Sequence, residues 1–282
     1  MIPGLRSGPD AISPTAHYTG QVWVRNGLSA PELGTWQGRL LVDALRPTMA
    51  LSRALGGPSL EGLLIARHRI IDAELERSVE AGEVGQVIEA ACGMSARGWR
   101  FSARWGGRLA YVEADLPAMA RRKREALARL GPRPAGHRVA GLDVRRDSGP
   151  GSLAALAAEL DPAVGTAIVT EGLLTYLGDA DVLALWRRIA AVLRRFEAGL
   201  YLSDLRLAGT GADPVEGIFN LALSGFVRGR VHSHFRDEED AARRLVDAGF
   251  DRARLHDGGT HPAAGGGDPG AVLIRVVEAR LR

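Results

Sequence analysis

Two features of this sequence could together bind a nucleoside. The first is a turn of small residues at 91–93, which follows a short apolar run and carries almost no side-chain bulk. A ligand can therefore approach the backbone closely at this turn. The second is a pair of acids, Glu113 and Asp115, which end the strand predicted at 109–114. A carboxylate in that position could accept hydrogen bonds from both hydroxyls of a ribose.

The glycines of the turn indicate which nucleoside the site takes. A nicotinamide dinucleotide site typically carries a G-x-G-x-x-G turn, but only Gly93 and Gly98 are glycines here. A pyrophosphate needs close packing against a helix N-terminus, whereas a nucleoside without phosphate tolerates a looser turn. The sequence therefore favours S-adenosylmethionine over NAD.

The elements that must position these residues follow an alternating pattern. Residues 1–82 are predicted to be mostly helical and to form an N-terminal cap over the core. One helix is expected from about 35 to 55, and a second begins after Ser59, its predicted N-cap residue. Residues 83–282 are predicted to be an α/β, Rossmann-like core that forms one structural unit with this N-terminal part. Ser95 is expected to be the N-cap residue of the helix after the turn. A less regular lid is expected at 206–235. The predicted strands are 84–90, 109–114, 137–142, 165–170, 198–203, 250–255 and 271–278. Helices between the first five indicate a parallel sheet, and the last two could pair as an antiparallel hairpin. This is the seven-stranded sheet of class I methyltransferases.

Composition bounds the functional class. The chain has 282 residues, 46% hydrophobic and 24% charged, with one cysteine, Cys92. It has neither an apolar run of the ~20 residues that span a bilayer nor a signal-peptide pattern, so we expect a cytoplasmic protein without a membrane partner. The calculated pI is about 9.5, but the net charge is only +3. Basic clusters such as 121–124 are predicted to be solvated helix faces, and we expect no nucleic-acid partner.

Five segments, at 12–29, 66–72, 87–99, 111–123 and 169–177, resemble the leucine carboxyl methyltransferase superfamily. Within it they are most similar to the tetracenomycin-type (TcmP-like) polyketide O-methyltransferases. The resemblance implies S-adenosylmethionine as methyl donor, S-adenosylhomocysteine as product, and a carboxylate oxygen of a small natural-product acid as acceptor. The chain departs from the family at the turn, where Ala91 replaces the more common glycine and Cys92 holds the middle position.

The resemblance also implies roles for individual residues on the cofactor side. Arg67 would hold the methionine carboxylate, with Arg69 as the near alternative and Asp72 orienting one of the two. Asp115 would bind the ribose. Glu171 would face the amino group or the sulfonium. The remaining expected cofactor contacts are Ala91, Gly93, Leu116, Leu142, Asp143 and Gly172, of which Leu142 and Asp143 would contact the adenine unless Asp143 caps the next segment.

On the substrate side, the expected contacts are Tyr18, Trp23, Arg25, Tyr176, Arg228 and Arg230. A carboxylate acceptor is already ionised at neutral pH and needs no general base, whereas a phenol would gain from one. The candidates for that role are His17, Tyr18, His232 and His234, whose spacing does not predict a metal site. A phenolic O-methyltransferase of secondary metabolism and a non-catalytic S-adenosylmethionine-binding regulatory or scaffold protein stay open, and the sequence predicts no oligomeric state.

Overall fold

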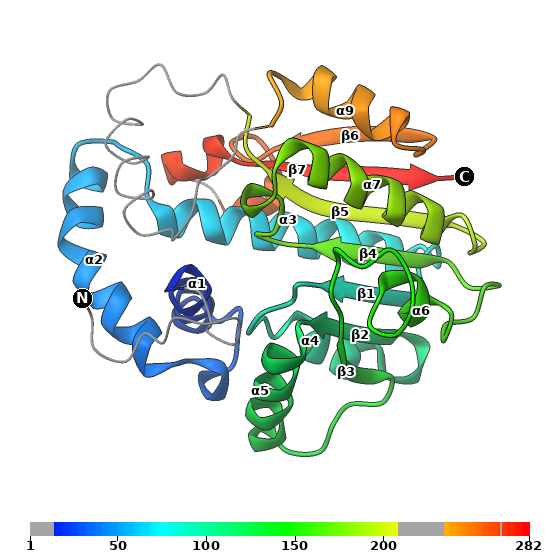
Figure 1. Cartoon of the computed structure of the whole chain (residues 1–282). Helices are drawn as coiled ribbons and strands as arrows, with labels where there is room; N and C mark the ends of the chain where they lie inside the picture. The colour runs from blue at the N-terminus through cyan, green and yellow to red at the C-terminus, as the bar shows by residue number, and fades with distance from the viewer. Residues whose placement is uncertain (1–13, 208–233, 266) are drawn as a thin grey trace.

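The computed structural model describes residues 14–207, 234–265 and 267–282, which form one seven-stranded sheet with helices on both faces (Figure 1). The strands are β1 (Gln86–Ala90), β2 (Ala110–Asp115), β3 (His137–Gly141), β4 (Thr166–Thr170), β5 (Gly199–Leu205), β6 (Arg252–Asp257) and β7 (Arg275–Leu281). The α-helices are α1 (Pro14–Arg25), α2 (Trp36–Ala54), α3 (Leu60–Glu80), α4 (Arg97–Trp105), α5 (Pro117–Leu127), α6 (Leu153–Ala157), α7 (Asp179–Leu193) and α9 (Glu238–Asp247).

The strand order is β3-β2-β1-β4-β5-β7-β6. Strands β1 to β5 are parallel, and β7 runs antiparallel between β5 and β6. Both the predicted parallel sheet and the predicted C-terminal hairpin are therefore confirmed. The last strand starts later than predicted, because Pro269–Leu273 forms a 3-10 helix before it.

Alternate residues of the strands pack into two separate cores, as the two-residue period of a strand requires. Ile88 and Val112 join α6, α7 and α9 on one face, whereas Val87 and Tyr111 join α3 and α4 on the other. Figure 1 shows these two helical layers on opposite sides of the sheet. Because both faces are covered, the open edge for a ligand is the one where the parallel strands end.

Helices α1 and α2 extend the molecule beyond that edge, and both α2 and α3 begin at capped residues. The hydroxyl of Thr35 accepts a hydrogen bond from the Gly38 N–H at 3.0 Å. The hydroxyl of Ser59 accepts one from the Gly62 N–H at 2.9 Å, which confirms the predicted cap. Among the residues that the structure describes, no helix is both long enough and apolar enough to cross a bilayer.

Two local predictions are wrong. The residue that caps α4 is Ala96, not Ser95, whose hydroxyl instead accepts a hydrogen bond from the Arg97 N–H. Lys123, predicted on a solvated face, is fully buried. Its ammonium lies 2.7 Å from Glu113, which His137 also contacts at 2.8 Å. The basic run 121–124 thus has one member that faces inward, because a helix face repeats every three to four residues.

Candidate functional site

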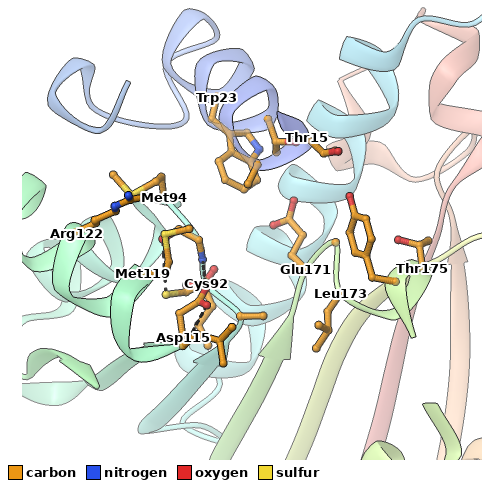
Figure 2. Close-up of a pocket in the computed structure, with 18 of the residues that line it drawn as sticks. Thr15, Trp23, Cys92, Met94, Asp115, Met119, Arg122, Glu171, Leu173 and Thr175 are labelled. Carbon is orange, nitrogen blue, oxygen red and sulfur yellow. Dashed lines mark hydrogen bonds between the residues drawn. The ribbon is translucent and has the colours of Figure 1, made fainter. Parts of the chain in front are cut away.

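A cavity of about 260 Å³ opens at the carboxyl ends of β1, β2 and β4, between α1 and α5 (Figure 2). In the strand order, β1 leads to β2 and β3 on one side and to β4 and β5 on the other. Ligands of open α/β sheets bind at this point, where the order reverses. The residues that line the cavity come from α1, α3, the end of β1 and the turn after it, the end of β2, α5, and the loop after β4. The topology therefore places the predicted nucleoside site at a known kind of ligand position.

The turn after β1 has the backbone shape that a close ligand approach requires. Gly93 has a φ of 50°, and a Cβ added there would meet nothing within 4 Å, so the space above it is open. Ala91 has a φ of 55°, a left-handed conformation that costs an alanine roughly 1–2 kcal/mol. Burial raises the pKa of the Cys92 thiol well above its usual range, so this side chain packs as an uncharged residue.

Asp115 is held in place by the same turn. One carboxylate oxygen accepts a hydrogen bond from the Gly93 N–H at 2.8 Å, and the other accepts from the Leu116 N–H at 2.7 Å. Burial raises the pKa of this carboxyl group, and the two backbone donors partly offset that effect. Each oxygen can still accept a further hydrogen bond, because a carboxylate offers about four acceptor positions.

Opposite Asp115, the loop after β4 carries an ion-paired cluster. Arg67 Nε lies 3.0 Å from Glu171, and its Nη1 lies 3.2 Å from Asp204 at the end of β5. The Gly172 N–H donates to Asp204 at 2.6 Å. Gly172 has a φ of 68°, and an added Cβ would lie 3.0 Å from Arg67 Nη2. The loop therefore needs glycine here so that the guanidinium can reach the cavity.

Beneath this cluster lies Arg97, a fully buried arginine that the sequence analysis missed. Its guanidinium contacts three carboxylates, those of Asp72, Glu89 and Glu171, the last two at 2.8 and 2.6 Å. Glu89 and Glu171 both line the cavity. Arg97 thus joins α3, β1 and the loop after β4 directly under the site.

The charges of this network fix its ionisation. Burial alone would raise the pKa of Asp72, but His68, Arg97 and Arg100 hold it at about 2. The pKa of Glu171 is lowered for the same reason, because His68, Arg97 and Arg67 outweigh its burial. Asp72 pairs with Arg97 and Arg100, not with Arg67 or Arg69 as expected. Arg69 faces a second cavity, of about 640 Å³, on the C-terminal loop side of α3.

The structure brings most of the predicted cofactor residues together at the first cavity. Of the described residues that line it, those predicted from the sequence are Arg67, Ala91, Gly93, Asp115, Leu116, Glu171, Gly172, Trp23 and Tyr176. Leu142 and Asp143 are not among them. Leu142 is buried, and Asp143 accepts a hydrogen bond from the Arg145 N–H at 3.0 Å, as a residue that shapes a local turn does.

The predicted acid–base candidates lie away from the cavity or outside the described residues. Neither His17, Tyr18 nor Arg25 lines it, although all three belong to α1. Burial raises the pKa of Tyr18 to about 12. His234 contacts Asp179 at 2.6 Å and the Leu174 carbonyl at 3.0 Å. His232, Arg228 and Arg230 lie outside the described residues.

His17 gives a test of how α1 is attached. The pKa of its ring is lowered from 6.5 to about 4, because the ring is buried and Arg122 is near. Its Nδ1 lies within hydrogen-bond distance, 2.9 Å, of the Thr35 hydroxyl, whose oxygen also accepts from the Gly38 N–H. As the pH falls below 6.5, the unfolded chain takes up the proton before the folded chain does.

We therefore expect the free energy of unfolding to fall between pH 6.5 and pH 4, by up to about 3 kcal/mol from this ring. Urea unfolding at a series of pH values would measure it. His17→Asn keeps both a hydrogen-bond donor and an acceptor near Thr35 but does not titrate, so its unfolding free energy should depend less on pH over this window. An equal pH dependence in the two proteins would contradict the assignment.

Several residues around the cavity gave no signal in the sequence. Met94, Met119 and Arg122 form one wall, and Thr15 of α1 faces it (Figure 2). Thr19 of α1 also lines the cavity. Met94 lies in the turn before α4, and the other four are of types common on any helix, so only the way these elements surround the cavity reveals them. The indole N–H of Trp23 is buried and has no hydrogen-bond acceptor among the described residues. It is therefore a donor available to a ligand.

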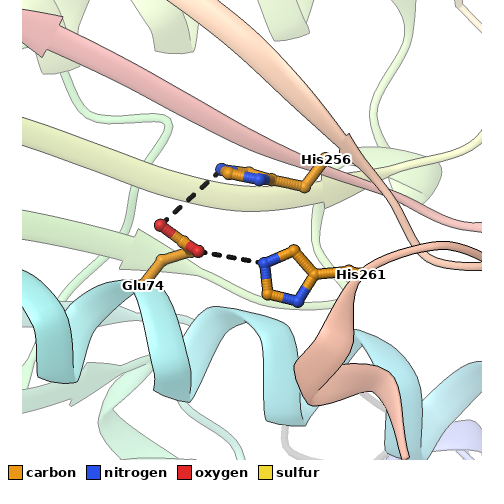
Figure 3. Close-up of side chains that lie close together, drawn as sticks. All are labelled: Glu74, His256 and His261. Atoms are coloured by element: carbon orange, nitrogen blue, oxygen red, sulfur yellow. Dashed lines mark hydrogen bonds and ion pairs between the residues drawn. The ribbon is translucent and has the colours of Figure 1, made fainter. Parts of the chain in front are cut away.

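A second group of titratable residues lies away from this cavity, where α3 meets the C-terminal loop (Figure 3). Ligand atoms of Glu74, His256 and His261 lie within 4.8 Å of one another, a donor set that suits zinc. However, the Ala263 N–H donates to Nδ1 of His261, which leaves the proton on Nε2 to bond Glu74 at 3.0 Å. Arg77 also contacts Glu74. The observed arrangement fits an ion-paired contact that holds the loop against α3 better than it fits a metal site.

The chain is similar to known methyltransferases in sequence. The sequence profile of the leucine carboxyl methyltransferase family matches residues 31–190. A candidate S-adenosyl-L-methionine-dependent methyltransferase of Mycolicibacterium paratuberculosis is 34% identical over 145 residues, 49% of this chain and 44% of that protein. Another from Rhodococcus jostii is 35% identical over 136 residues, 48% of this chain and 44% of that protein. The alignments thus span less than half the length of these relatives.

Solved structures share the fold at low sequence identity. A candidate methyltransferase from Thermobifida fusca superposes with a TM-score of 0.60 at 15% identity, covering 99% of this chain and 98% of that one. Magnesium protoporphyrin IX methyltransferase from Synechocystis, solved with S-adenosylhomocysteine, gives 0.50 at 15% identity over 86% and 99% of the two chains. The fold is that of class I S-adenosylmethionine-dependent methyltransferases. Since the family profile matches more than half of its residues, this chain belongs to the leucine carboxyl methyltransferase family.

Proposed function

We propose that this protein is an S-adenosylmethionine-dependent O-methyltransferase that forms a methyl ester on a carboxylate of a small, polyketide-like acid. The observation that carries the proposal is the pairing of Asp115 with the open turn at Gly93, 2.8 Å away, at the point where the strand order reverses. The relatives named as S-adenosylmethionine-dependent methyltransferases support the methyl donor.

The residues around the cavity fit this cofactor. The carboxylate of Asp115 would accept from the ribose hydroxyls, and the open backbone at Gly93 would lie under the ligand. Arg67 Nη2 has no hydrogen-bond partner among the described residues and would donate to the methionine carboxylate. On the same side of the cavity as Arg67, the carboxylates of Glu89 and Glu171 supply negative potential. A ligand that carries both an ammonium and a sulfonium suits such a lining.

When bound, S-adenosylmethionine supplies a methyl group activated by a positively charged sulfur. The protein has to align the acceptor oxygen and exclude water. The unpaired indole N–H of Trp23 is buried on the cavity wall and can donate to an acceptor oxygen. Helix α1, which carries Trp23, covers the cavity and keeps it closed on that side (Figure 2).

The lining favours a carboxylate acceptor over a phenol. No described residue that lines the cavity is a histidine, and the one cysteine there has a raised pKa. A phenol has a pKa near 10 and would need a base within hydrogen-bond reach. Of the three described candidates, His17 and Tyr18 do not line the cavity, and His234 is occupied by Asp179 and a carbonyl oxygen. An acceptor that is already ionised needs no such base.

The proposal is tested by transfer of label from methyl-labelled S-adenosylmethionine to a panel of aromatic and polyketide acids and matched phenols. Each labelled product is then treated with mild base. We expect base-labile label on acids, as a methyl ester gives. Base-stable label on the phenols would contradict the carboxylate acceptor. Absence of label from every acceptor, with S-adenosylhomocysteine still bound tightly, would contradict catalysis and favour a regulatory binder.

The assignment of Arg67 has a matched control on the same helix. Arg67→Met should raise the Kd for S-adenosylhomocysteine about tenfold or more, because it removes a charge-assisted hydrogen bond. Arg69→Met should leave the Kd nearly unchanged, because Arg69 faces the other cavity. Calorimetric titration measures both, and circular dichroism checks that each variant is folded. Equal affinities in the two variants would show that Arg67 does not hold the ligand.

A further inference from the structure

The first cavity is lined by two arginines that lie on different sides of it. Arg67 contacts Glu171, and Figure 2 shows Glu171 and Arg122 on opposite sides of the cavity. Arg122 makes no hydrogen bond or ion pair with the residues that the structure describes. S-adenosylmethionine carries one anionic group, its carboxylate, which the proposed function assigns to Arg67. Any anion that Arg122 binds in this cavity therefore belongs to another ligand.

Helix α1 faces Arg122 with a row of polar side chains. Thr15, Thr19 and Trp23 all line the cavity and follow one another at intervals of four residues, which places them on one face of the helix. The pKa of His17 on the same helix is lowered by burial and by the charge of Arg122, so the guanidinium lies near α1. The donors of α1 and the cation of α5 thus surround the same space.

Two donors on this face of α1 have no acceptor. The indole N–H of Trp23 and the hydroxyl of Thr15 are buried and make no hydrogen bond with the described residues. Only 6% of Trp23 is exposed, and its ring centroid lies 4.7 Å from that of His68, which contacts Glu171 at 2.9 Å. The indole is therefore fixed in place. A buried donor without an acceptor is costly, and an oxygen of a bound ligand would remove that cost.

The neutral donor and the cation suit different groups of an acceptor. The reacting carboxylate loses its charge, because one of its oxygens forms a bond to the methyl carbon while the electrons of the carbon–sulfur bond pass to sulfur. An ion pair with this carboxylate would be stronger before the transfer than during it and would slow the reaction. The N–H of Trp23 can orient it without such a pair. Arg122 suits a group that stays ionised throughout.

We propose that the acceptor is a dicarboxylic acid, whose reacting carboxylate accepts from the indole N–H of Trp23 and whose second carboxylate is bound by Arg122. This inference rests on the proposed function and narrows its substrate class. An acid with one carboxylate would leave the Arg122 guanidinium in the cavity without a partner. A site built to bind a polar group discriminates against the analogue that lacks it.

Calorimetric titration of acids into the complex with S-adenosylhomocysteine tests the second carboxylate without turnover. The probes are the isomers of naphthalenedicarboxylic acid, whose carboxylates differ in separation, and naphthoic acid. We expect at least one dicarboxylate to bind about tenfold or more tightly than naphthoate, because it adds charge-assisted hydrogen bonds. Equal affinities for all these acids in the wild-type protein would overturn the proposal.

Two neighbouring arginines of α5 provide the variant and its control. Arg122→Met should remove the preference for dicarboxylates, whereas Arg121→Met, at an exposed residue that does not line the cavity, should keep it. Both variants should bind S-adenosylhomocysteine with the wild-type Kd. A raised Kd in Arg122→Met alone would assign Arg122 to the cofactor and overturn the proposal. So would a preference that survives the loss of Arg122.

Trp23→Phe separates the two contacts, because it keeps the aromatic ring and removes only the N–H group. It should weaken the binding of naphthoate and of the dicarboxylates by the same factor, so that the ratio of their affinities stays at the wild-type value. Circular dichroism checks that the variant is folded. If the affinity for every acid were unchanged, Trp23 would not hold the reacting carboxylate.

Transfer of labelled methyl to the same acids distinguishes a failure of this inference from a failure of the proposed function. Label on the dicarboxylates in preference to naphthoate supports both. Dicarboxylates that bind preferentially but take up no label would contradict methyl transfer to a carboxylate and still support the contact with Arg122. Equal label on acids with one and with two carboxylates would support the proposed function and overturn the dicarboxylate acceptor.

Discussion

Replacing Arg97 with methionine is expected to lower the free energy of unfolding by about 3–5 kcal/mol, as the loss of one partner from a buried ionic network does. Arg97 is fully buried and is the shared cation of Asp72, Glu89 and Glu171. Methionine fills much of the same volume but leaves three carboxylates without that charge. Each keeps at least one other partner, such as Tyr111 for Glu89, Arg100 for Asp72 and Arg67 for Glu171, so the fold should survive.

Arg104, on the same helix, is the matched control for this change. It pairs with Glu76 and Glu80, but 54% of its side chain is exposed. Exposed pairs contribute about 0–1 kcal/mol, so Arg104→Met should have a small effect. Urea unfolding of the two variants measures the difference. If both lose the same stability, the ionic network does not hold α3, β1 and the loop after β4 together.

Arg97→Met should also change how the free energy of unfolding depends on pH in acid. The pKa of Asp72 is about 2 in the folded protein and near 3.8 in the unfolded chain. Its contribution is therefore present above pH 4 and lost as the pH falls towards 2. Removing Arg97 raises the folded pKa, so the unfolding free energy of the variant should fall less steeply over that range than the wild-type value does.

The parts of the site that the sequence predicted are those with a local cause. The turn at 91–93 is visible because its residues are small, and Asp115 is visible because it ends an apolar strand. Ser59 is recognisable as a cap because the helical pattern starts directly after it. In each case the residues that determine the structure lie within one turn or one strand of it.

The parts that the sequence did not predict depend on contacts between distant segments. The partners of Arg97 lie 25, 8 and 74 residues away, and no local pattern connects them. Lys123 belongs to a basic run, yet its charge meets Glu113 of β2 in the interior. Glu113 and Asp115 share a strand face but have different partners, since only Asp115 reaches the cavity. Such pairs become visible only when the order of the strands is known.

Asp115→Asn is expected to weaken binding of S-adenosylhomocysteine about tenfold or more, because a hydrogen bond to a charged acceptor contributes about 1.5–3 kcal/mol. The carboxylate accepts from the N–H groups of Gly93 and Leu116 and has acceptor positions left for two hydroxyls. An asparagine offers one oxygen and one NH2 group, so it cannot accept from both backbone donors and both hydroxyls.

Asp143 provides the control, because it also follows a strand of the sheet and was predicted to contact the adenine. Its carboxylate accepts from the Arg145 N–H and does not line the cavity, so Asp143→Asn should change the Kd little. Calorimetric titration of both variants with S-adenosylhomocysteine separates the two carboxylates. A large loss with Asp143→Asn would place the adenine at β3 after all, and an unchanged Kd with Asp115→Asn would remove the ribose contact on which the proposed function depends. Because the amide oxygen in the Asp115→Asn variant can keep one backbone hydrogen bond to the turn, a large loss of affinity in a folded protein would report the ligand contact itself.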